Sequence, residues 1–235
     1  MPHNAFEART LDEPATVDAD TANRLRAFVL ANTELRRPDD VPEVQLHLAG
    51  DLTALWARSE AELGRPGLEP PFWATAWAGG RALARYLLDA RAVVSRRSVL
   101  DLGSGSGLCA IAAALAGATV TAVDVDDLSM VAIDLNAAAN GVQVRRVQRD
   151  LLATEPPDVD VIVAGDVWYE RTMSERVLAW LRRARGRGTD VLLGDPGRTY
   201  LPTQGLELLA GYPVTADPTV ESAAVTQARV FRLSG

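Results

Sequence analysis

The 235-residue chain is 48% hydrophobic and 23% charged, a composition that excludes general disorder. Its 31 acidic residues outweigh 24 basic ones, all arginine, and the net charge of −7 is a poor match to nucleic acid. The single cysteine, Cys109, excludes an internal disulfide and a thiolate metal site. No apolar run approaches the ~20 residues of a membrane span, and no signal peptide is visible. We expect a cytoplasmic monomer without metal, membrane or nucleic-acid partners.

Before residue 71, apolar residues recur at helical spacing in segments separated by prolines. The pattern predicts a helix, a short strand and a second helix, in the order Val17–Asn32, residues 44–48 and Asp51–Leu63. We expect residues 1–17 to form a mobile tail. Residues 18–70 are expected to form an extension that shapes the substrate side, ending in a linker rich in glycine and proline.

From residue 71 to residue 235, short apolar strands alternate with helical segments, as in a parallel sheet covered by helices. The predicted strands are Val99–Leu102, Thr119–Val123, Val142–Gln148, Val159–Ala164 and Asp190–Gly194. The predicted helices are Gly79–Ala90, Leu108–Ala116, Leu128–Asn140, Thr172–Ala184 with a capping box at its start, and a short one at Leu206–Ala210. The tail from Tyr212 to Leu233 has room for two more strands. We therefore expect a Rossmann-like α/β domain with a seven-stranded, mostly parallel sheet, an antiparallel C-terminal strand and helices on both faces.

A glycine-rich loop, Gly103-Ser-Gly-Ser-Gly107, follows the first of these strands. Glycines there let a ligand lie against the backbone. Leu108 stands where a dinucleotide-binding loop has its third glycine, and Asp101 would repel a pyrophosphate. A carboxylate at that place suits the cationic amino-acid end of S-adenosylmethionine, and Asp124, at the end of the next strand, can accept from ribose hydroxyls. The loop therefore favours S-adenosylmethionine over a nicotinamide cofactor; the alternative is a tight turn with two solvated acids.

Asp150 closes the third strand, where it can accept from the adenine amine or remain an exposed loop acid. The cofactor contacts expected at these three strand ends are Asp101, Gly103, Ser104, Gly105, Gly107, Asp124, Val125, Asp150 and Leu151.

Two levels of family resemblance follow from these segments. The loop VLDLGSGSG (99–107) with Asp124 resembles the class I, seven-β-strand, S-adenosylmethionine-dependent methyltransferases. The segments that resemble one branch, the lysine methyltransferases of the β subunit of electron transfer flavoprotein, are PPFWATAWAGGRALARYLLD (70–89), GDVWYE (165–170), GDPGR (194–198) and residues 33–56. The resemblance covers nearly all of the chain after residue 32.

The resemblance implies that Trp77 and Gly165 contact the cofactor, and that Asp166 and Tyr169 form the acid-x-x-aromatic motif of the acceptor site. Trp168 lies between them, beside the reacting centre or on the far side of the loop. Trp73 shapes the same pocket or packs in the core. Asp166 also follows the carboxyl end of a strand, where ligands of open α/β sheets bind, and a carboxylate with aromatic neighbours suits a cationic amine.

The resemblance implies a protein substrate, the β subunit of electron transfer flavoprotein. A lysine with pKa near 10.4 must lose its proton before it accepts a methyl group, at a cost of roughly 4.6 kcal/mol at pH 7, and a neighbouring carboxylate increases that cost. We therefore assign Asp166 to capture and orientation of the amine, with the proton leaving to solvent. A small-molecule N-methyltransferase acting on a nicotinamide-like amine and a non-catalytic S-adenosylmethionine-binding module remain open.

Overall fold

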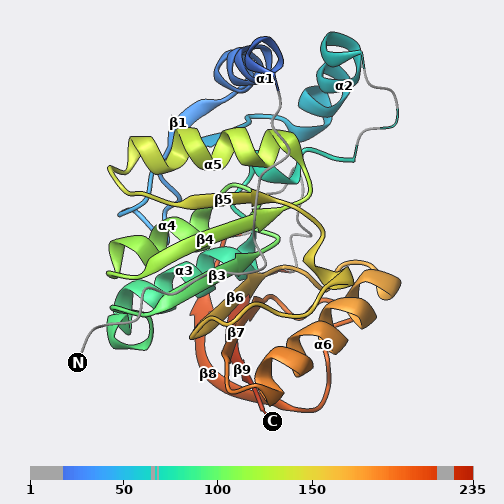
Figure 1. Cartoon of the computed structure of the whole chain (residues 1–235). Coiled ribbons are helices and arrows are strands. Elements are labelled where there is room, and N and C mark those ends of the chain that lie inside the picture. Colours follow the sequence, from blue (N-terminus) through green and yellow to red (C-terminus); the bar gives the residue numbers. More distant parts are fainter. Residues whose placement is uncertain (1–17, 65–66, 68, 216–224, 235) are drawn as a thin grey trace, which may run out of the picture.

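The computed structural model describes residues 18–64, 67, 69–215 and 225–234, so the expected tail over residues 1–17 lies outside the described residues. A sheet runs through the middle of the molecule (Figure 1). Its strands are β3 (Ser98–Leu102), β4 (Thr119–Asp124), β5 (Arg145–Gln148), β6 (Val161–Gly165), β7 (Asp190–Asp195), β8 (Leu206–Pro213) and β9 (Gln227–Leu233). In the described part of the chain it has seven strands, in the order β5-β4-β3-β6-β7-β9-β8.

The strands from β5 to β7 are parallel, and β9 pairs antiparallel with both β7 and β8. The predicted fold class and the antiparallel C-terminal edge are confirmed. The predicted helix at Leu206–Ala210 is wrong, because these residues begin β8. The apolar run is too short for a stable isolated helix, and pairing with β9 supplies its backbone hydrogen bonds.

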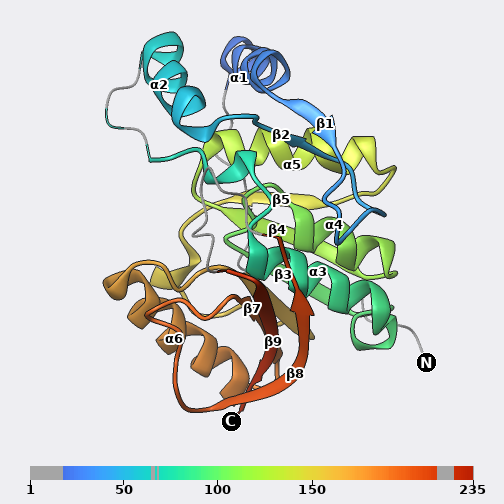
Figure 2. The same cartoon turned by 180° about the vertical axis from the view of Figure 1, so that it is seen from behind.

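Helices cover both faces of the sheet, as the sequence predicts. On one face lie α3 (Ala78–Asp89), α4 (Leu108–Leu115) and α5 (Asp127–Ala139), and on the other lies α6 (Arg171–Gly186); Figure 2 shows the first group from its own side. Because successive strand residues point to opposite faces, Val99 and Val161 pack under α3 and α4, whereas Leu100 and Ile162 pack under α6. The cap of α6 is Glu170, not Thr172, since its carboxylate accepts from two backbone N–H groups of the first turn. In the parts of the chain that the structure describes, three short 3₁₀ helices lie in the connections: η1 (Phe72–Ala74), η2 (Arg91–Val93) and η3 (Leu151–Ala153).

The N-terminal extension packs on the α5 side of the sheet (Figure 1). It consists of α1 (Ala19–Asn32), the antiparallel pair β1 (Glu34–Arg36) and β2 (Leu46–Leu48), and α2 (Leu52–Leu63). The buried side chain of Asn136 on α5 links it to the glycine loop. Its Oδ1 accepts from His47 N at 2.7 Å, and its Nδ2 donates to Ser106 O at 2.8 Å. The extension is thereby connected to the loop that the sequence assigns to the cofactor.

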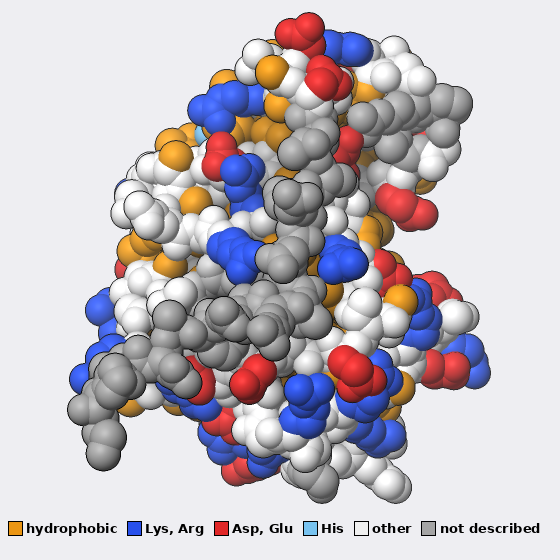
Figure 3. Space-filling view, in the orientation of Figure 1, with side chains coloured by type: hydrophobic (Ala, Val, Ile, Leu, Met, Phe, Trp, Pro, Cys, Tyr) orange, Lys and Arg blue, Asp and Glu red, His pale blue; other side chains and the backbone are white. Residues whose placement is uncertain are grey.

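Charge is mixed on the face seen in Figure 3, where arginine and acidic side chains alternate over the region of α6. The net charge of −7 is therefore not gathered into one acidic area on that face.

The start of α3 lies against the ends of β6 and β7 through glycines that leave no room for a side chain. A Cβ on Gly194 would overlap the carbonyl oxygen of Gly79, and a Cβ on Gly165 would lie 2.8 Å from Gly80 Cα. We predict that Gly194→Ala lowers the free energy of unfolding by about 3 kcal/mol, since overpacking forces backbone shifts. Urea denaturation measures this. Gly186→Ala, where the added Cβ meets nothing within 4 Å, is the matched control and should not destabilise the protein.

Candidate active site

The glycine loop turns sharply between β3 and α4. Gly103, Gly105 and Gly107 have φ angles of +67°, +53° and +81°, in the left-handed region that glycine adopts without a steric penalty. The backbone N–H groups of Gly103 and Ser104 donate to Val123 O at 2.9 and 3.0 Å. These bonds hold the loop against the end of β4, and the three glycines present backbone without a Cβ at alternate positions of the loop.

Asp101 is buried directly beneath the loop. Its Oδ2 accepts from Ser104 Oγ at 2.5 Å and from Ala110 N at 3.0 Å. Burial raises the pKa of the Asp101 carboxyl to about 7. A cation brought near this group would favour its charged form, so the site fits a ligand that carries positive charge.

Asp124 closes β4 and faces the same loop. Its Oδ2 accepts from Gly105 N at 2.8 Å, and its Oδ1 accepts from the backbone N–H groups of Val125 and Asp126 at 2.8 and 3.1 Å. Burial raises the pKa of this carboxyl as well. The next side chain, Val125, is 65% exposed, which leaves an apolar surface open beside Asp124.

At the end of β5, Asp150 is exposed and already engaged. It accepts from Leu152 N at 2.9 Å and pairs with Arg176 at 2.7 Å, while Leu151 is buried. Asp150 is therefore exposed, as in the second of the two interpretations of the sequence, an exposed loop acid. Its expected contact with the adenine amine stays a prediction.

Asp166 lies in the turn between β6 and α6 with φ of +59°, a conformation that is rare for a residue other than glycine. Its Oδ2 accepts from Gly80 N at 2.7 Å, at the start of α3, and its own N–H donates to Gly194 O at 2.9 Å. Its Oδ1 accepts from Arg198 Nη2 at 2.7 Å and Nε at 3.2 Å. The carboxylate predicted to meet the acceptor amine is therefore already paired with an arginine.

The aromatic residues expected at the site lie in different surroundings. Trp168 is fully buried in the apolar cluster under α6, which matches the second of its two expected positions, on the far side of the loop, and not the one beside the reacting centre. The left-handed turn at Asp166 sends Val167 and Trp168 into the core. Tyr169 is 50% exposed, and Phe72 packs against it with ring centroids 5.4 Å apart.

Phe72 also contacts Trp77, with centroids 5.8 Å apart. The site is thus bordered by Phe72, Trp77 and Tyr169. Phe72 lies in the Trp-rich segment, but nothing in the sequence indicates that Phe72 faces the site and its neighbour Trp73 does not. Trp73 is fully buried between α1 and α5. Trp73 lines a cavity of about 350 Å³ next to Val125 and Asp126.

Gly165, expected to contact the cofactor, packs against Gly80 at the start of α3. Two residues of the site, Asp195 and Arg198, carry no role in the sequence prediction. Asp195 ends β7 at the same sheet edge as Asp166, and this strand-end position is the signal by which it could have been found.

Within the described ranges, no group of three or more potential metal ligands occurs and no helix is long and apolar enough to span a membrane.

The chain is similar in sequence to known methyltransferases. A sequence model of ribosomal protein L11 methyltransferase (PrmA) matches residues 82–166. The electron transfer flavoprotein beta subunit lysine methyltransferase of Mus musculus is 40% identical over 182 residues, which are 74% of this chain and 69% of that protein. The Xenopus laevis protein of the same name is 36% identical and covers 88% of this chain and 85% of its own length.

The chain belongs to the electron transfer flavoprotein beta subunit lysine methyltransferase family. It is a class I S-adenosylmethionine-dependent methyltransferase, and S-adenosylmethionine is its methyl donor. Among solved structures, a candidate RNA methyltransferase from Pyrococcus horikoshii aligns with a TM-score of 0.53 at 16% identity, over 76% of this chain and 94% of that one. That likeness supports the fold of this methyltransferase and nothing further.

The residues of the loop fit this cofactor. The left-handed glycines leave the backbone open, the buried Asp101 carboxyl favours a cationic group, and Asp124 stands beside an exposed valine. S-adenosylmethionine supplies a sulfonium-activated methyl group, and nothing in the set requires a phosphate ligand.

Proposed function

We propose that this enzyme methylates a lysine side chain of the β subunit of electron transfer flavoprotein. The observation that carries the proposal is the 36–40% identity to relatives with that named activity over most of both chains. An acidic and aromatic site at the carboxyl ends of β6 and β7 supports it, because such a site suits an amine.

In this proposal the cofactor lies across the carboxyl ends of β3, β4 and β5. Asp101 and the glycine loop border its amino-acid end, and Asp124 accepts from the ribose hydroxyls. Val125 and Leu151 flank the adenine, with Asp150 near the exocyclic amine, and Trp77 packs against the cofactor on the side of the acceptor. Gly165 acts by letting α3 approach the sheet, where Gly80 N binds Asp166.

Asp166 and Tyr169 are proposed to receive the acceptor amine. Asp166 orients the nitrogen, and the rings of Tyr169, Phe72 and Trp77 exclude water from it, which favours the neutral amine. Most of the rate comes from holding the nitrogen in line with the methyl group. The half-exposed Tyr169 and the exposed Val125 leave this edge open, which suits a protein acceptor better than a closed pocket for a small amine.

The proposal is tested by incubating the enzyme with S-adenosylmethionine and the recombinant flavoprotein, followed by mass spectrometry of the peptides. We expect increments of about 14 mass units, one CH₂, on lysine peptides of the β subunit. The enzyme has no lysine, so every methyl-lysine must come from the acceptor. Nicotinamide is incubated in parallel. Rapid methylation of nicotinamide with none on the flavoprotein would contradict the proposal and favour the small-molecule function.

A further inference from the structure

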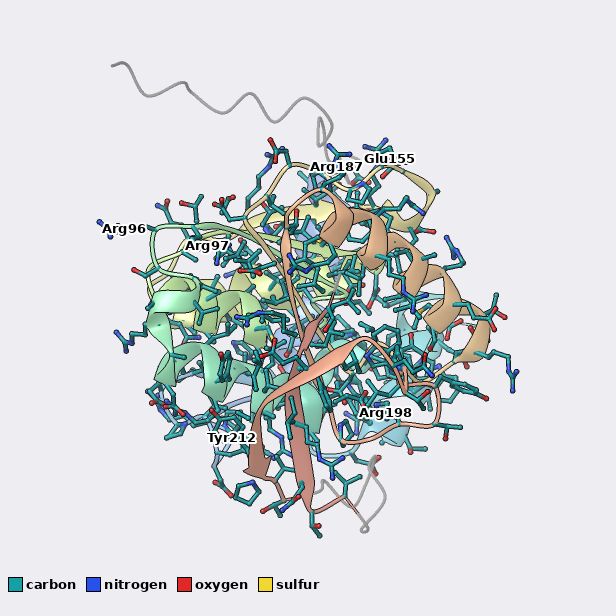
Figure 4. The ribbon with its side chains drawn as sticks, turned by 90° about the horizontal axis from the view of Figure 1, so that it is seen from below. Arg96, Arg97, Glu155, Arg187, Arg198 and Tyr212 are labelled. Atoms are coloured by element: carbon teal, nitrogen blue, oxygen red, sulfur yellow. The ribbon has the colours of Figure 1, made fainter. Side chains whose placement is uncertain are left out.

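One arginine and two carboxylates meet at the ends of β6 and β7. Arg198 binds Asp166 Oδ1 through Nη2 at 2.7 Å, and its Nε lies 3.9 Å from Asp195 Oδ2. Its guanidinium carbon lies 5.6 Å from the centre of the Trp77 ring. Figure 4 shows Arg198 on the loop after β7, on the opposite side of the molecule from Arg97 and Arg187. We call Asp166, Asp195, Arg198 and Trp77 the acceptor edge.

Asp195 is fully buried at this edge. Its Oδ1 accepts from the backbone N–H groups of Gly197 and Arg198, each at 2.6 Å. Its Oδ2 is buried and has no hydrogen-bond partner among the described residues. An unsatisfied buried carboxylate oxygen is costly, and among the described residues Arg198 is the base that forms an ion pair with it. The edge therefore carries two acids and one balancing base.

This balance matters for the acceptor. About one lysine in 2,500 is neutral at pH 7, and only the neutral amine has a free lone pair. A carboxylate beside an amine raises the amine pKa by about 1–3 units, so Asp166 alone would hold the acceptor in its unreactive form. A guanidinium against the same carboxylate has the opposite effect.

We infer that Arg198 is a positioning residue whose charge offsets Asp166 and Asp195, so that a carboxylate can orient the acceptor amine without preventing its deprotonation. The inference rests on the proposed amine acceptor. Arg198 remains paired with Asp166 while the amine donates to the carboxylate, and the proton of the ammonium leaves to solvent.

The other ionisable groups at the acceptor edge do not change their charge in the pH range where an amine loses its proton. Burial raises the pKa of the Tyr169 hydroxyl and that of the Cys109 thiol on α4, so both stay neutral. Burial raises the pKa of Asp195 to about 6. Above that pH, Asp195 adds a second negative charge to the acceptor edge, beside that of Asp166. Besides Arg198, the charged groups that act on the Tyr169 hydroxyl are Asp124, Glu69 and Glu170. Arg229 on β9 is the register partner of Asp195.

The test measures kcat for methylation between pH 6 and pH 10 in the wild type, Arg198→Gln and Arg198→Lys. We expect Arg198→Gln to move the acid limb of the profile to higher pH by about 1 unit or more. Arg198→Lys should keep the wild-type midpoint because it keeps the charge. Affinity for S-adenosylhomocysteine, measured by calorimetry, should stay within a few-fold in both variants. Arg97→Gln, which removes a 3.1 Å pair with Asp190 at the other end of the strands, is the control and should leave the limb in place.

Two results would overturn the inference. A loss of kcat by the same factor at every pH in Arg198→Gln would mean that Arg198 only shapes the loop. Methylation of the lysine introduced by Arg198→Lys, in a chain with no other lysine, would mean that this side chain occupies the acceptor position itself.

A second measurement needs no acceptor. The pKa of Asp195, followed by ¹³C NMR and assigned with Asp195→Asn, should rise further in Arg198→Gln and not in Arg198→Lys; an unchanged pKa would contradict the charge balance. Failure of the wild type to methylate the flavoprotein would refute the proposed function instead, and the pH profile would then use the amine that the enzyme does methylate.

Discussion

Asp124→Ala is expected to weaken binding of S-adenosylhomocysteine by about 100-fold. The carboxylate accepts from three backbone N–H groups, of Gly105, Val125 and Asp126, and is proposed to accept from the ribose. Loss of a charged hydrogen bond costs about 1.5–3 kcal/mol, and each 1.4 kcal/mol is tenfold in affinity. Calorimetry measures the change. Asp134→Ala, which removes an exposed acid of α5, should bind as the wild type does.

Glycine substitutions separate the backbone strain from the ligand contact. Gly105 and Gly141 both have positive φ, and neither has an atom closer than 3.8 Å to an added Cβ. Alanine at either position carries a similar strain of about 1–2 kcal/mol, but only Gly105 lies in the proposed cofactor loop. We expect Gly105→Ala to lose cofactor affinity and Gly141→Ala to keep it. Equal affinity for S-adenosylhomocysteine in Asp124→Ala, Gly105→Ala and the wild type would contradict the assignment of this loop as the cofactor site.

Asp166→Asn is expected to reduce turnover by about 100-fold while affinity for S-adenosylhomocysteine changes by no more than a few-fold. The substitution keeps the shape of the side chain but removes the charge that pairs with Arg198 and is proposed to orient the amine, an effect of about 1.5–3 kcal/mol. Steady-state kinetics with the flavoprotein, or with whichever amine the wild type methylates, measures it. Asp190→Asn, at the amino end of β7, serves as the control.

Tyr169 refines this prediction. If its ring matters through contact with Phe72, Tyr169→Phe should cost less turnover than Tyr169→Ala. Full turnover in Asp166→Asn would contradict the assignment of the acceptor site, whatever the result at Tyr169.

Local sequence patterns predicted most of the fold. Strand–helix alternation and short apolar strands predicted the parallel sheet, because a strand buried on both faces must be apolar throughout. The exception was Leu206–Ala210, since five residues do not distinguish a helix turn from an edge strand. Their pairing partners on β9, from Leu233 to Val230, lie 20 to 27 residues further along the chain.

The acceptor site was predicted less completely than the cofactor loop. The loop is contiguous, so its glycines and Asp101 are visible at once, and Asp124 follows from the next strand. The aromatic residues that border the acceptor site could not be predicted from adjacent residues in this way. Whether Trp168 or Phe72 faces the site depends on one left-handed residue, Asp166, which turns Trp168 inward, and on η1, which brings Phe72 to Tyr169.

By itself, the sequence determined the fold class, the glycine loop, the acids at the strand ends and the family motifs, because each of these depends on residues close together in the chain. Tertiary structure alone decided that Asp166 is bound by Gly80 and Arg198, which are 86 and 32 residues away. It also decided that Asp195 shares this arginine. Charge balance depends on distance in space, and parallel strands bring the ends of β6 and β7 together from separate parts of the sequence.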